Sequence, residues 1–341
     1  MDVLREPLEA ECAWTGAEMR QKTSWRYRLT EDEIAELEAA RDCAKGTGLP
    51  LEQIGAEDFP LPCLGQVVRG WADDLENGRG FFLVKGLPVE RYAEQDAALI
   101  FWGIGRHMGV PVSQNASGDL LGHVRDTGRS IKDPSVRGYQ TRVRLPYHTD
   151  GSDVVGLLCL RPALAGGLST IVSSTAVYNE VVRRRPDLVE VLYEPFYFDR
   201  REEQAAGEDP WYATRLACYR QGKLSMRYIR GFIESAQRFP EIPRLSSRQV
   251  ELLDLIDSLT TDPNNYLDMD FEPGDMQFVS NYMIMHSRTH YDDHADPALK
   301  RHLLRLWLTL PDGRELDPDF GRGMSSAEGQ GRGGVTPRVA V

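Results

Sequence analysis

Short runs of apolar or alternating residues, separated by turn residues, fill the second two-thirds of the chain and restrict its fold more than any other feature. From about Val112 onward these runs occupy residues 138–150, 154–160, 166–174, 213–229, 265–281 and 302–310. Many short strands joined by Gly, Pro and Asp turns are typical of a β-sandwich or barrel. Regular helical crossovers do not separate them, and neither a GxGxxG motif nor a P-loop is present. We therefore expect a mainly β chain with helical decoration and a jelly-roll core.

The first third of the chain has helical rather than strand-like patterning. Thr30 and Glu33 form a capping box ahead of a helix, and residues 63–78 and 94–109 have helical spacing. An apolar run between glycines, residues 80–88, predicts one buried strand. The expected organisation is a single domain over residues 1–320. It has a helical part at about 1–100, a jelly-roll core at about 101–312 with helical insertions at 175–195 and 246–259, and a Gly-rich, flexible tail at 321–341.

The charge and cysteine content exclude several classes of protein. The formal net charge is −12, from 52 acidic and 40 basic residues, and such a surface repels nucleic acid and anionic lipid. No apolar run approaches the ~20 residues that span a bilayer, and the N-terminus lacks the apolar segment of a signal peptide. The five cysteines show no CxxC spacing, which indicates free thiols in a reducing compartment. We expect a cytoplasmic protein with no nucleic-acid or membrane partner.

The stretch LPYHTDGSD at residues 145–153 raises the question of a metal site. His148 and Asp150 are two residues apart, so both side chains point the same way on a strand, and Gly151 permits a sharp turn after them. An HxD tripeptide also occurs in ordinary turns, with Asp150 and Asp153 as capping residues. Two histidines and one carboxylate would form a facial triad that leaves three positions open on Fe(II). Such a site needs a second histidine.

The candidates for that histidine are His286, His290 and His294, spaced four residues apart in NYMIMHSRTHYDDHADP. On a helix the three would line one face and could form a self-contained zinc site. The residues before His286, however, continue a strand-like run after a Pro-Gly-Asp turn. We therefore predict that His286 lies at a strand end and that His290 and His294 are exposed and bind no metal.

The last apolar run, RHLLRLWLTL, carries two arginines on one face of a predicted strand. Leu304, Leu306 and Leu308 alternate with Arg301 and Arg305. Four residues of strand separate the two arginines by roughly 13 Å, so each is expected to bind its own anion. The alternative is that one or both form a salt bridge with an acidic residue of this acidic chain.

Together these motifs resemble the TauD/TfdA (taurine dioxygenase-like) family of Fe(II)/2-oxoglutarate-dependent dioxygenases. The resemblance rests on LPYHTDGSDVVGLLCLRPALAGGLSTIVSS, NYMIMHSRTHYDD and KRHLLRLWLTLPDG, and covers roughly Gly103–Asp312. It implies a double-stranded β-helix (cupin-like) core in a single catalytic domain. The site residues that it implies are the iron ligands His148, Asp150 and His286, the 2-oxoglutarate contacts Ser169 (with Thr170 beside it) and Arg301, and Arg305 for an anionic substrate. The inserted DDHADPALK lengthens the loop after His286 relative to some relatives, so the two arginines could exchange roles.

The resemblance also implies the reaction. Fe(II), 2-oxoglutarate and O2 would be used to oxidise an unactivated C–H bond of a small organic substrate, with release of succinate and CO2. Hydroxylation is favoured, desaturation and cyclisation remain open, and the carboxylate of Asp150 disfavours halogenation.

Features outside the metal motif bear on the substrate and on partners. Arg305 and Gln114 point to an anionic or secondary-metabolite-like small molecule, although Gln114 and Asn115 could equally form a polar turn. The charged segment 200–214 is either a lid or a solvated loop. A homo-oligomer is compatible with the sequence. The alternative to an oxygenase is a non-redox jelly-roll metal protein, either zinc hydrolase-like or a ligand-binding module.

Overall fold

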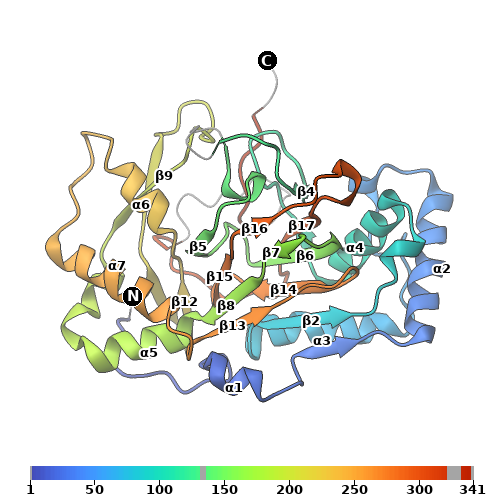
Figure 1. Ribbon diagram of the computed structural model, residues 1–341. Helices are drawn as coiled ribbons and strands as arrows, with labels where there is room; N and C mark the ends of the chain where they lie inside the picture. The colour runs from blue at the N-terminus through green and yellow to red at the C-terminus, as the bar shows by residue number, and fades with distance from the viewer. Residues whose placement is uncertain (1, 131–135, 321–331, 339–341) are drawn as a thin grey trace.

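Two β-sheets pack face to face in the computed structural model, which describes residues 2–130, 136–320 and 332–338 (Figure 1). The larger sheet has the strand order β1-β2-β14-β6-β17-β3, with β4 also paired to β17, and the smaller has the order β13-β8-β15-β5. All neighbours in these sheets are antiparallel except β1 and β2. This arrangement confirms the mainly β, jelly-roll prediction.

The strands are short, as the sequence runs predicted. Those of the larger sheet are β1 (Arg26–Arg28), β2 (Phe81–Lys85), β3 (Val110–Pro111), β4 (Leu121–Val124), β6 (Val154–Arg161), β14 (Met276–Ser280) and β17 (His302–Thr309). Those of the smaller sheet are β5 (Leu145–His148), β8 (Ser169–Ser173), β13 (Tyr266–Met269) and β15 (Ile284–Arg288). Separate hairpins and pairs are formed by β7 (Ala165–Gly166), β9 (Phe196–Asp199), β10 (Trp211–Thr214), β11 (Ala217–Arg220), β12 (Lys223–Met226) and β16 (Tyr291–Asp292).

Helices cover the outer face of each sheet (Figure 1). α2 (Glu31–Thr47), α3 (Leu64–Asn77) and α4 (Glu94–Met108) pack on the larger sheet, and α5 (Ser174–Arg184) and α7 (Ser247–Thr260) pack on the smaller one. Two short helices complete the set, α1 (Gly16–Arg20) and α6 (Arg230–Ala236). The capping box of Thr30 and Glu33 is confirmed at the start of α2, where each side chain bonds the other's backbone N–H. None of the described helices is long and apolar enough to cross a lipid bilayer.

The two faces of β17 lie in different cores, as its alternation predicted. Leu304, Leu306 and Leu308 pack with the helices outside the larger sheet, whereas Leu303 and Trp307 lie between the two sheets. Successive strand residues point to opposite faces, so Arg301 and Arg305 share the inner side with Leu303 and Trp307. The face that carries the arginines is therefore the one that lines the interior of the jelly roll.

The predicted strand at residues 138–150 is only partly formed. Gly138–Gln140 is a 3-10 turn, and the strand β5 begins only at Leu145. The carbonyls of Thr141 and Val143 accept hydrogen bonds from the Arg288 side chain instead of from a neighbouring strand. Hydrogen bonds from the buried Arg288 guanidinium thus take the place of strand-to-strand hydrogen bonds at these two residues.

Part of the predicted flexible tail lies against the body of the protein. The backbone N–H groups of Gly334 and Val335 donate to the carbonyls of Gly151 and Ser113, at 2.7 and 2.9 Å. The Arg332 Nε donates to Asp153 at 2.9 Å. Residues 332–338 are thereby attached beside the turn that carries His148 and Asp150, whereas residues 321–331 and 339–341 lie outside the described part of the chain.

Candidate active site

Sheet register brings His148, Asp150 and His286 together. β5 and β15 are antiparallel neighbours in which His148 lies directly opposite His286, and the two ring centroids are 4.3 Å apart. Asp150 follows the end of β5. Its Oδ1 lies 3.8 Å from the His148 Nε2, and its Oδ2 lies 3.7 Å from the His286 Nε2. All three side chains are at least three-quarters buried.

The separations suit ligands of one metal ion better than hydrogen bonds. Two ligands at about 2.1 Å from a metal are about 3 Å apart when cis and about 4.2 Å apart when trans, and the observed distances lie between these values. The His148 Nδ1 lies 2.8 Å from the Pro146 carbonyl and donates to it, so its Nε2 presents a lone pair to the centre. The donor set of two imidazoles and one carboxylate is that of a non-haem Fe(II) site.

The protonation states agree with metal binding. Burial and the neighbouring His286 lower the pKa of His148 to about 4, so the imidazole is neutral at pH 7. Burial alone would raise the pKa of Asp150, but His286 and Arg305 beside it hold that pKa well below its ordinary value. At pH 7 a metal ion could therefore bind the Asp150 carboxylate and the His148 imidazole without displacing a proton from either group.

Two residues that the sequence reasoning missed hold Asp150 in place. The Trp307 Nε1 donates to the Asp150 Oδ2 at 2.9 Å, and the Asp150 backbone N–H donates to the Asn281 side chain at 2.9 Å. Trp307 lies two residues after Arg305 and therefore on the same inner face of β17. This spacing is the signal in the sequence that could have identified Trp307 as a residue of the site. Such contacts orient a carboxylate ligand before the metal arrives.

His290 and His294 do not belong to this cluster. His286 lies on β15, so the helix required for a self-contained zinc site is absent at these residues. The His290 side chain is 63% exposed and lies 3.7 Å from Asp292. His286 lies on a strand as predicted, but in the middle of β15 and not at its end, and His294 is half-buried and not exposed.

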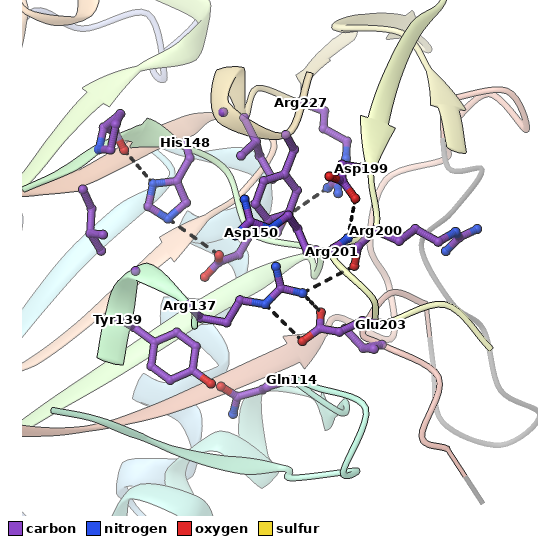
Figure 2. Close-up of a pocket in the computed structure, with 18 of the residues that line it drawn as sticks. Gln114, Arg137, Tyr139, His148, Asp150, Asp199, Arg200, Arg201, Glu203 and Arg227 are labelled. Carbon is purple, nitrogen blue, oxygen red and sulfur yellow. Dashed lines mark hydrogen bonds and ion pairs between the residues drawn. The ribbon is translucent and has the colours of Figure 1, made fainter. Parts of the chain in front are cut away.

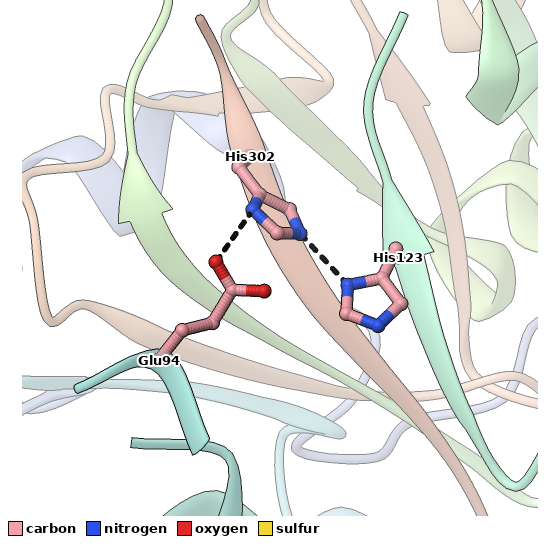
Figure 3. Close-up of side chains that lie close together, drawn as sticks. All are labelled: Glu94, His123 and His302. Atoms are coloured by element: carbon pink, nitrogen blue, oxygen red, sulfur yellow. Dashed lines mark hydrogen bonds and ion pairs between the residues drawn. The ribbon is translucent and has the colours of Figure 1, made fainter. Parts of the chain in front are cut away.

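In a second group of potential ligands, Glu94, His123 and His302, the two histidines are hydrogen-bonded to each other (Figure 3). The His302 Nε2 lies 2.8 Å from the His123 Nδ1, and its Nδ1 lies 3.4 Å from Glu94 and 3.0 Å from the Arg161 Nη2. A guanidinium can only donate, so the His302 Nδ1 accepts and its Nε2–H donates to His123. Because the positively charged Arg161 guanidinium already contacts the His302 nitrogen that faces Glu94, it would repel a metal ion there.

We predict that His302 makes stability depend on pH. Burial is the main cause that lowers its pKa below the ordinary 6.5, with His123 and Arg161 adding to the effect. Below about pH 6.5, His302 is therefore protonated in the unfolded chain but stays neutral in the folded chain. The free energy of unfolding has its full His302 contribution above pH 6.5 and loses it as the pH falls. In His302→Gln, the thermal midpoint should fall less between pH 7.5 and 5 than in the wild type, both metal-loaded. Parallel pH profiles would contradict the prediction.

A cavity of about 690 Å³ opens beside the His148 and Asp150 side chains (Figure 2). His148 and Asp150 point toward one another at its wall, and Arg137 points toward Glu203, with 3.2 Å between Nε and Oε1. Arg200, Arg201, Glu203 and Glu208 bring part of the 200–214 segment to the wall, between the paired strands β9 and β10. Gly334, Val335 and Thr336 of the C-terminal segment also line it. A cavity of this size accommodates a small organic molecule.

Arg305 and Gln114 act as a unit in this cavity. The Arg305 Nε donates to the Gln114 Oε1 at 2.6 Å, and the Gln114 Nε2 donates to the backbone carbonyls of Arg305 and Leu120. The Arg305 guanidinium lies 4.5 Å from the Tyr139 ring centre, and its Nη1 lies 3.9 Å from Asp150. Both polar atoms of the Gln114 amide are thus occupied, and Gln114 positions Arg305.

Arg301 lies elsewhere, near the glycine pair that precedes Ser169. Gly167 has a φ of +73°, and a Cβ there would lie 3.2 Å from the Arg301 Nε, so the glycine leaves room for the guanidinium. Ser169 faces the interior, where its hydroxyl donates to Gln277 at 2.8 Å. Thr170 points to the opposite face of β8, toward Tyr147, so the structure does not bring it together with Ser169 and Arg301.

Comparisons with known proteins agree with this architecture. The model of the "Taurine catabolism dioxygenase TauD, TfdA family" matches residues 47–307. FR-33289 synthase of Streptomyces rubellomurinus is 32% identical over 325 residues, which cover 93% of this chain and 94% of that protein. The taurine hydroxylase-like protein SAT17 of Stachybotrys chartarum is 30% identical over 334 residues, which cover 92% and 84%.

Solved structures share the fold at low sequence identity. Asparagine oxygenase in complex with Fe(II), (2S,3S)-3-hydroxyasparagine and succinate superposes with a TM-score of 0.66 and 16% identity, covering 92% of this chain and 100% of that one. The non-haem iron oxygenase OrfP, in complex with Fe and α-ketoglutaric acid, gives 0.60 and 17%, covering 83% and 94%. No comparison supports the non-redox alternative. Because the family model spans most of the chain and relatives match at 30% identity or more, the chain belongs to the TauD/TfdA family of Fe(II)/2-oxoglutarate-dependent dioxygenases.

Proposed function

We propose that His148, Asp150 and His286 bind the catalytic iron of this oxygenase. The observation that carries the assignment is the convergence of two imidazole nitrogens on the two oxygens of one buried carboxylate, at 3.7 and 3.8 Å. Fe(II) held by these three residues would have positions left for 2-oxoglutarate and O2, and would supply the oxidation of a C–H bond coupled to the decarboxylation of 2-oxoglutarate to succinate and CO2.

For 2-oxoglutarate, we assign the distal carboxylate to Arg301 and Ser169. Arg301 is 96% buried and its Nη1 has no hydrogen-bond partner in the described part of the chain, which favours an anion at that place. Arg305 lines the large cavity instead, so the two arginines have separate roles, as their spacing along the strand suggested.

The substrate that we propose is a small anionic molecule, which is hydroxylated. Arg305 and Arg227 both line the cavity beside Asp150, where the Arg227 Nη1 donates to the Asp150 carbonyl at 3.4 Å. The Arg227 guanidinium lies beside the stacked rings of Phe198 and Tyr212, 5.7 and 5.6 Å from their centres, and its Nε has no hydrogen-bond partner among the described residues. Two guanidinium groups next to the metal site favour a carboxylate, sulfonate or phosphorus oxyanion. The cavity wall would orient its C–H bond and exclude water.

The test is succinate formation by the purified protein with Fe(II), ascorbate, 2-oxoglutarate and air, with and without a pool of small organic anions. Wild-type protein should form succinate, His148→Ala should not, and one member of the pool should stimulate the reaction. Arg305→Met should bind 2-oxoglutarate normally but lose that stimulation. Failure of the iron-loaded wild type both to form succinate and to bind 2-oxoglutarate would overturn the proposal.

A further inference from the structure

A second buried arginine, Arg288, packs against the same tyrosine ring as Arg301. Arg288 is the last residue of β15 and is 5% exposed, and Arg301 precedes β17 and is 4% exposed. Their guanidinium carbons lie 4.8 and 5.0 Å from the centre of the same ring, that of Tyr291. Two buried guanidinium groups therefore face one aromatic ring.

Neither guanidinium makes as many hydrogen bonds as a buried charged group normally makes. The Arg288 Nη2 donates to the carbonyls of Thr141 and Val143. Among the described residues, the Arg288 Nε and Nη1 and the Arg301 Nη1 have no hydrogen-bond partner. Asp293 is bonded to the backbone N–H of Arg301, at 2.8 Å, and not to its guanidinium. Buried charged N–H groups without partners are costly, so the site favours an anion that is added after folding.

The position of this pair relative to the metal cluster identifies the anion. Arg288 follows His286 by two residues on β15, so it points to the same face about 6–7 Å further along. Ser169 lies directly opposite Arg288 in the sheet register. The five-carbon chain of 2-oxoglutarate, chelated to the metal through its 2-oxo acid end, would extend along β15 toward this point.

We propose that Arg288 is a second arginine for 2-oxoglutarate, and that it binds the distal carboxylate together with Arg301. This inference rests on the proposed metal site, because the metal fixes the other end of the molecule. Two guanidinium groups make the site selective for a 2-oxo acid that ends in a carboxylate. A 2-oxo acid of the same length with a terminal methyl group, 2-oxopentanoate, would leave both cations unpaired.

The experiment measures binding rather than turnover. Full-length protein is loaded with Mn(II) without O2, and the affinities for 2-oxoglutarate and 2-oxopentanoate are measured by calorimetry. Arg288→Met should weaken 2-oxoglutarate binding about 10- to 100-fold, the effect of losing one or two charge-assisted hydrogen bonds. It should change 2-oxopentanoate binding less than about threefold. Arg288→Lys should be intermediate, since it keeps the charge and loses the planar fork.

Controls separate this inference from the proposal on which it rests. Arg220→Met, at the exposed turn end of the β11–β12 hairpin, should bind both acids as the wild type does. If the Mn(II)-loaded wild type binds no 2-oxoglutarate, the proposed metal site fails. If the wild type binds it and Arg288→Met or Arg288→Lys binds it equally well, Arg288 is not a ligand and the inference fails.

A purely structural role for Arg288 predicts a different pattern. Arg288→Met would then lower the thermal midpoint of the metal-free protein and weaken both acids alike, which would overturn the inference. As a 2-oxoglutarate ligand, Arg288 should affect the two acids differently, so a selective loss of 2-oxoglutarate affinity supports the inference whatever the loss of the bonds to Thr141 and Val143 does to the midpoint. If Arg288→Met does not fold, the affinities of Arg288→Lys decide between the two roles.

Discussion

His286→Ala should lose metal binding and all succinate formation, whereas His290→Ala should keep both. The His286 imidazole supplies one of three donors that lie within 4.8 Å of one another, while His290 is exposed four residues away and lies 3.7 Å from Asp292. Removing an outer-shell partner of a metal ligand costs 10- to 100-fold in affinity. Loss of the ligand itself should therefore weaken Mn(II) binding more than about 100-fold in an anaerobic titration.

Trp307→Phe should weaken metal binding less than His286→Ala does, and so provides an intermediate variant. It removes the hydrogen bond to the Asp150 Oδ2 and keeps an aromatic ring, so we expect an affinity loss of about 10- to 100-fold. The metal-free forms of all three variants should unfold at similar temperatures. Retention of wild-type Mn(II) affinity by His286→Ala would place the metal elsewhere.

Asp153→Ala should be among the most destabilising single substitutions in the chain, although Asp153 is only three residues from Asp150. The Asp153 side chain is 1% exposed and accepts from the Tyr282 hydroxyl at 2.7 Å, the Leu310 N–H at 3.0 Å and the Arg332 Nε at 2.9 Å. Its removal leaves a buried hydroxyl and a half-buried guanidinium without their acceptor. We expect a loss of about 3 kcal/mol in the free energy of unfolding, measured in denaturant.

The matched control is Asp292→Ala, because that side chain is 74% exposed. Its effect should stay within about 0.5 kcal/mol, as for most surface substitutions. A cost below 1 kcal/mol for Asp153→Ala would show that the metal-bearing turn does not depend on this carboxylate.

Local pattern predicted much of the fold because the determinants lie close together in sequence. The capping box of Thr30 and Glu33 and the two faces of β17 follow from spacings of a few residues, and both are confirmed. The strand predicted at residues 138–150 is shorter, because Arg288, far along the chain, takes the carbonyls of Thr141 and Val143. A local pattern carries no information about such a partner.

The sequence by itself determined the jelly-roll class, the pairing of an HxD motif with a distal histidine, and the presence of two arginines on the inner face of the last strand. The tertiary structure decided what these residues meet. Strand register set His148 opposite His286, a left-handed Gly167 made room for Arg301, and the hydrogen bond that Arg305 donates to Gln114 directed Arg305 into the cavity. It also placed Arg288 and Arg301 against the same ring, that of Tyr291, which the spacing of residues in the sequence did not predict. The physical reason is that side-chain direction follows from local period, whereas proximity depends on pairing between strands that lie more than 100 residues apart.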